Sequence, residues 1–131
     1  MSDNGKAQEI FTPAVLAEMF PPQKADQFFD ALYGDAADGA YDIELRFRGQ
    51  RGRDLEFELL LKQRPGKCLA CNLTFGLPQV FSRHPIINLK GLAVEVGRRM
   101  GQGPAAPAWS LGNTRIISDE LHALPITITL S

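Results

Sequence analysis

The residues best suited to metal or redox chemistry lie close together in the chain. Cys68 and Cys71 have the C-x-x-C spacing of zinc knuckles and of thiol–disulfide enzymes, and His84 follows them. Thiolate sulfur and imidazole nitrogen are ligands that Zn²⁺ prefers, and His122 supplies a fourth such group. Cys68, Cys71, His84 and His122 are therefore one candidate zinc site, and the cysteine pair alone is a candidate redox site.

The backbone expected around the cysteines favours a different interpretation. Cys71 belongs to an apolar row of alternate residues typical of a strand, in which positions i and i+3 point to opposite faces. Cys68 then points away from Cys71, and the two thiols serve as ordinary filling without a cofactor. If Cys71 were a nucleophile and His84 its general base, a third residue would have to orient the base, and none can be identified. No catalytic residue is therefore assigned.

Arginines suggest a second kind of site, for anions. Arg51 and Arg53 lie in "GQRGR", a segment rich in turn residues, and we expect neither to have an acidic partner. The chain as a whole has 14 basic and 15 acidic residues, so no overall field attracts nucleic acid. No aromatic residues are interleaved for base stacking, and nucleic-acid binding is therefore the weakest of the alternatives.

Two strands are predicted on either side of this turn. Apolar and charged residues alternate over 41–48 and again over 54–62, which indicates strands with one buried and one solvated face. The charges also predict the register, because facing pairs of opposite sign are favourable. We expect three cross-strand pairs: Asp42 with Lys62, Arg46 with Glu58, and Arg48 with Glu56.

Helices are predicted on both sides of these strands. Thr12 and Pro13 form a helix start, Pro21 ends that helix, and a second one runs to about Tyr33 with Gly34 as its stop. Asn88 is expected to cap a further helix that ends near Met100.

The remaining segments predict further strands. Residues 69–77 alternate like a third strand of a meander, and 109–116 resemble a hairpin on Gly112-Asn113. Residues 124–130 also alternate, and Pro125 within them indicates an edge strand or the start of one. The fold class expected is α+β: an N-terminal helical hairpin, an antiparallel β-meander over about 41–77, a helix over about 88–100 on one sheet face, and C-terminal strands joining the sheet.

The length of 131 residues fits one domain, which we place at 11–131 after a flexible leader at 1–10. No signal peptide is visible, and no apolar run approaches the roughly 20 residues that a membrane span needs. These features predict a cytoplasmic protein without a membrane partner.

Surplus apolar residues are the main clue to function. Leu60 interrupts the polar row of the second strand, Val80, Phe81, Ile86 and Ile87 crowd one loop, and Trp109 follows a connector. Such surface is often buried against another chain. We therefore expect a non-enzymatic binding domain of unknown ligand that forms a homodimer through the outer sheet face or a strand edge, with the metal or thiol site as the alternative.

Overall fold

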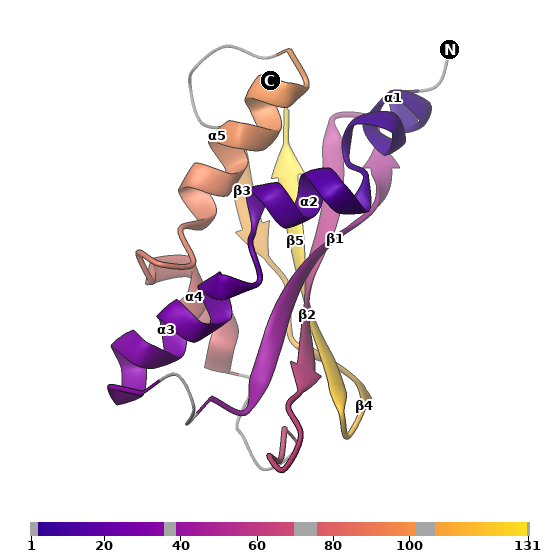
Figure 1. Ribbon diagram of the computed structural model, residues 1–131. Coiled ribbons are helices and arrows are strands. Elements are labelled where there is room, and N and C mark those ends of the chain that lie inside the picture. Colours follow the sequence, from indigo (N-terminus) through magenta and orange to yellow (C-terminus); the bar gives the residue numbers. More distant parts are fainter. Residues whose placement is uncertain (1–2, 36–38, 70–75, 102–106, 131) are drawn as a thin grey trace.

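The structure is a computed structural model that describes residues 3–35, 39–69, 76–101 and 107–130. It has five helices and five strands in the described residues, and the antiparallel sheet carries its helices on one face (Figure 1). The elements are α1 (Asp3–Ile10), α2 (Pro13–Met19), α3 (Gln23–Tyr33), β1 (Tyr41–Arg51), β2 (Asp54–Gln63), α4 (Leu77–Arg83), α5 (Leu89–Arg99), β3 (Ala108–Leu111), β4 (Arg115–Ser118) and β5 (Leu121–Thr129). The α+β fold class predicted from the sequence is confirmed.

The strand order is β1-β2-β5-β3, and β4 also pairs with β5. All of these pairings are antiparallel. The outer edge of β5 is divided, because β4 pairs with its first residues and β3 with its last ones. β1 has β2 as its single strand partner in the described sheet, so β1 is an edge strand.

The predicted register of β1 and β2 is correct over most of their length. Asp42 faces Lys62 and Arg46 faces Glu58, as the charges indicated. The third expected pair is wrong, because a bulge after Phe47 leaves Arg48 without an opposite residue. Its guanidinium lies 3.9 Å from the carboxylate of Glu58 instead of facing Glu56.

β5 lies in the middle of the sheet, so the edge position inferred from Pro125 is wrong. The carbonyl of Pro125 accepts a hydrogen bond of 2.9 Å from the Gly112 N–H, on the side where β3 and β4 lie. In an antiparallel strand the N–H of a residue points to the same side as its carbonyl. The missing N–H of Pro125 therefore falls in the gap between the two short strands, where no ladder bond is lost.

Two other strand predictions do not match the structure. β3 and β4 each pair with β5 rather than with each other, so the hairpin on Gly112-Asn113 is absent. The third strand expected at 69–77 falls largely on residues 70–75, which lie outside the described residues. At its described ends, Leu69 is in a bend and Leu77 begins α4, while β5 occupies the place beside β2.

The helix boundaries follow the predicted capping residues. The Thr12 hydroxyl accepts a hydrogen bond of 3.3 Å from the Val15 N–H at the start of α2. At the start of α5, Oδ1 of Asn88 accepts a hydrogen bond of 3.1 Å from the Gly91 N–H. Gly34 ends α3 with a φ of 82°, a conformation that favours glycine. The segment expected to be a loose leader contains α1, and Ala7 of this helix is buried.

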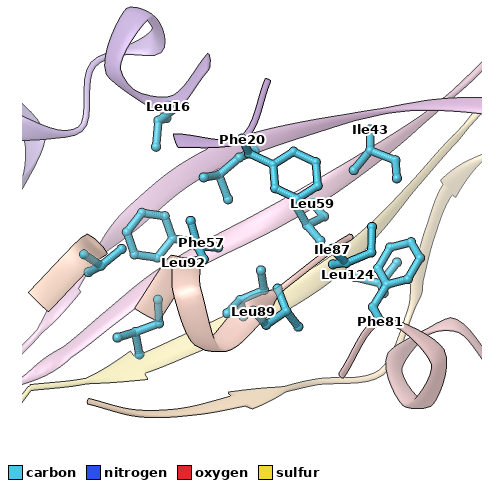
Figure 2. Packing of buried hydrophobic residues seen from close by; sticks show 14 of the residues in the cluster. Leu16, Phe20, Ile43, Phe57, Leu59, Phe81, Ile87, Leu89, Leu92 and Leu124 are labelled. Carbon is cyan, nitrogen blue, oxygen red and sulfur yellow. The ribbon is translucent and has the colours of Figure 1, made fainter. Parts of the chain in front are cut away.

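The core lies between the helices and one face of the sheet. Figure 2 shows Leu59 and Leu124 of the sheet near Leu89 and Leu92 of α5. Leu60 points to the opposite face but is only 3% exposed, between Glu44 and Ala123 on the neighbouring strands. Phe81 and Ile87 are also buried, so much of the apolar surplus noted in the sequence is covered within the chain.

Candidate functional site: a groove along the free edge of β1

The residues of the predicted zinc site have different environments. Cys68 is exposed in the loop after β2 and is disulfide-bonded, so the expectation that it is a free thiol serving as ordinary filling is wrong. His84 is half-buried at the end of α4, and His122 is buried within β5. Cys71 lies outside the described residues. In the part of the chain that the structure describes, no three histidine, cysteine or acidic residues are grouped to hold a metal ion, and the zinc site stays a prediction.

The environment of His84 is that of a packed side chain. Its ring lies edge-on to Phe28, with 4.8 Å between the ring centroids. Its Nδ1 accepts a hydrogen bond of 3.2 Å from the Ile86 N–H, which leaves Nε2 to carry the proton in the neutral ring. These contacts position the chain where it leaves α4, and they involve no acidic or thiol group.

His122 lies in the apolar row of β5, between Leu61 of β2 and Ile116 of β4. The residue is only 2% exposed. Burial lowers the pKa of His122 below the usual 6.5, and the negative charge of Asp119 opposes part of this effect. His122 is therefore a neutral core residue at pH 7 rather than a solvent-accessible base.

The lowered pKa predicts how stability depends on pH. The unfolded chain binds a proton at His122 near the usual pKa, while the folded chain resists it, so the unfolded state holds more protons as pH falls. We expect the free energy of unfolding to fall between about pH 7.5 and pH 5, and the slope to become smaller in His122→Gln. Urea unfolding followed by circular dichroism at several pH values measures both slopes. Equal slopes for the wild type and His122→Gln would contradict the lowered pKa of His122.

The two arginines proposed for anion binding lie at the tip of the β1–β2 hairpin. Arg51 is in an ion pair with Glu56, at 3.1 Å, so the expectation that it lacks an acidic partner is wrong. The pair is exposed, and such pairs contribute little to stability. Arg53 is exposed in the turn itself. Anion binding at this tip stays a prediction.

The clearest concave feature is a groove of about 640 Å³ between α2 and β1. One side is built from Leu16, Ala17, Phe20 and neighbouring residues of the α2 region. The other side is built from the consecutive residues 42–47 of β1. Because side chains of a strand alternate between faces, consecutive residues line one groove only where it runs along the strand's edge. The groove therefore follows the free edge of β1.

Comparisons with known protein families, with curated proteins and with solved structures find nothing that matches this chain.

The edge of β1 offers backbone hydrogen-bonding groups beside apolar side chains. Among the described residues, no backbone hydrogen bond joins residues 42–47 to any segment other than β2. Alternate N–H and C=O groups of an edge strand point outward and are available to a further strand. The exposed apolar residues Pro13, Ala17 and Pro22 lie next to this row, so an added strand has both a ladder to join and a surface to bury.

Charged side chains line the outer rim of the groove. Lys62 contacts Glu44 at 3.1 Å, and Arg64 contacts Asp42 at 3.0 Å. Both carboxylates are more than half exposed, so they can accept further partners. Arg46 is exposed and takes part in none of the ion pairs of the described residues.

Sequence reasoning did not find this groove. The alternation over 41–48 revealed both faces of β1, but it carries no information about which side of the strand is unpaired. That depends on strand order, which is set by β5 pairing with β2 across a large sequence separation.

None of the described helices combines the length and the apolar character that a bilayer crossing requires.

Proposed function

We propose that this chain is a small non-enzymatic binding domain that captures an extended polypeptide segment by adding it as a strand to the edge of β1. The observation that carries the proposal is the position of the groove, which runs along an unpaired strand edge and beside the apolar surface of α2. Strand addition of this kind obtains affinity from main-chain hydrogen bonds and specificity from pockets for alternate side chains.

The expected ligand follows from the two rims of the groove. One face of the added strand would contact the exposed residues Pro13 and Ala17, so alternate residues of the ligand are apolar. The opposite face would lie beside the charged row of Asp42, Glu44 and Arg46, so the intervening residues are charged or polar. The groove volume is within the range of about 300–1,000 Å³ common for binding pockets.

The compartment we propose is the cytosol, where the exposed disulfide of Cys68 is expected to be reduced.

A substitution in the wall of the groove tests this function. Ala17 is exposed on α2 and lines the groove, so Ala17→Arg is expected to fill the groove without disturbing the core. The probe is a synthetic peptide chosen from a phage-displayed random library on the wild-type protein. We expect Ala17→Arg to weaken its binding at least about tenfold in calorimetry, because the added side chain excludes the ligand strand.

The same helix offers a matched control. Ala14 is exposed on α2 but does not line the groove, so Ala14→Arg adds the same side chain to the same helix and is expected to leave binding unchanged. Hydrogen exchange with bound peptide should show added protection of the amides at 42–47. Peptide binding that is equally strong in Ala17→Arg and wild type, or protection confined to other segments, would overturn the proposal.

A further inference from the structure

The charges on the edge of β1 identify one occupant of the groove. We propose that the occupant is a second copy of this chain, whose β1 pairs antiparallel with the first about a twofold axis at Leu45. This inference rests on the proposed function, because it assigns the ligand of the same groove. It joins two five-stranded sheets into one continuous sheet, with α2 of each copy beside the new strand pair.

The exposed row of β1 is self-complementary in this arrangement. Its residues run from acidic to basic: Asp42 and Glu44, then Arg46 and Arg48. With Leu45 on the axis, Glu44 of each copy faces Arg46 of the other, and Asp42 faces Arg48. Symmetry forms each pair twice, so four pairs of opposite charge line the shared edge. Opposite charges directly across a strand pair are favourable, and like charges are unfavourable.

Neighbouring registers are unfavourable for the same reason. Moving the axis to Glu44 sets the two Glu44 carboxylates against each other, and moving it to Arg46 opposes the two Arg46 guanidinium groups. A shift that pairs odd with even positions turns the apolar row of one copy toward the charged row of the other. The axis at Leu45 is therefore the one register near the middle of the groove in which all facing charges differ in sign.

The apolar row of β1 agrees with this register. Leu45 then meets Leu45 of the second copy, and Ile43 meets Phe47, which is only half-buried in the single chain. Phe47 already borders the groove, so the second strand would bury the part of its ring that the chain alone leaves accessible. Apolar cross-strand neighbours of this kind stabilise antiparallel pairs.

Contacts within the chain leave the charged row available. The ion pairs of Asp42 with Arg64 and of Glu44 with Lys62 involve carboxylates that are 63% and 51% exposed. Arg46 has no ion pair among those of the described residues, and Arg48 approaches Glu58 only to 3.9 Å. The bulge frees Arg48 from the regular ladder with β2, so its side chain can turn toward the new edge.

Charge reversal at two positions tests both the partner and the register. Glu44→Arg places Arg against Arg46 of the second copy, and Arg46→Glu places Glu against Glu44, twice in each dimer. We expect the wild type to sediment as a dimer and each single variant to dissociate at least about tenfold more readily. The double variant Glu44→Arg with Arg46→Glu restores opposite charges, and an equimolar mixture of the two single variants should form a mixed dimer.

The double variant and the mixture also control for folding, since a variant that failed to fold could not recover in either. A wild type that is monomeric at about 1 mM, a concentration at which even weak association is visible, would overturn the inference. Dimers that persist in both single variants would overturn it too, because they form elsewhere. If instead the proposed function is wrong, the selected peptide should bind Ala17→Arg as strongly as it binds the wild type. If both are correct, the selected peptide should dissociate the dimer, because it competes for one edge.

Discussion

Replacing Phe11 by alanine is expected to lower the free energy of unfolding by about 3–5 kcal/mol, the usual cost of removing a buried phenylalanine. Phe11 is only 3% exposed and follows α1 directly. The centroid of its ring lies 5.2 Å from that of the Phe57 ring, in an edge-on arrangement, and 5.6 Å from that of the Phe47 ring. The ring therefore joins the N-terminal segment to both β1 and β2, and its loss leaves a cavity at the end of the hairpin. Urea unfolding measured by circular dichroism gives the change.

Two further variants make the result specific to this packing. Phe11→Leu keeps part of the apolar volume and should cost clearly less than Phe11→Ala. Glu9→Ala lies in α1 at an exposed position and is expected to change stability by at most about 0.5 kcal/mol, the usual effect of a surface substitution. A cost below about 1 kcal/mol for Phe11→Ala would mean that the N-terminal segment does not pack on the sheet as the structure describes.

The sequence predicted those parts of the fold that depend on near neighbours. The helix starts at Thr12 and Asn88 were found because a capping side chain bonds to a backbone group three residues away. The alternation in β1 and β2 was found because it reflects one buried face along a single strand. α1 was missed because its apolar residues, Ala7 and Ile10, give a weak helical pattern within a polar segment.

The parts that were missed depend on the order of strands. Pro125 indicates an edge strand, but the gap between β3 and β4 leaves no ladder partner for its missing N–H, so a central strand tolerates the proline. The alternation over 69–77 suggested that a third strand follows β2 in space, yet the place beside β2 belongs to β5. Strand order is set by contacts between distant segments, and a local period contains no information about them.

The candidate site was predictable in kind but not in place. A strand edge was one of two surfaces expected to bind a second copy, and the other was the outer sheet face that includes Leu60. The burial of Leu60 removes the apolar residue that favoured the outer face. The free edge of β1 keeps both apolar and charged groups accessible, so the structure directs the proposal to the edge.

Replacing Phe28 by alanine is expected to have an effect as large as that of Phe11→Ala, about 3–5 kcal/mol in the free energy of unfolding. Phe28 lies in α3 and is fully buried. Its ring is 5.3 Å from that of Phe81 in α4 and 4.8 Å from that of His84, both edge-on. Edge-on aromatic pairs add about 0.5–1.5 kcal/mol beyond the buried area, so the loss includes contacts between α3 and the end of α4.

Leu32, one turn further along α3, provides the control because its side chain is 49% exposed. Leu32→Ala should cost less than about 1 kcal/mol, since little apolar area leaves the core. The comparison also bears on His84, whose ring packs against Phe28. If the ring is structural, His84→Ala and Phe28→Ala should be non-additive in a double-mutant cycle, because each removes the same contact. Strict additivity would mean that the two rings do not stabilise each other, and the histidine would again be free for another role.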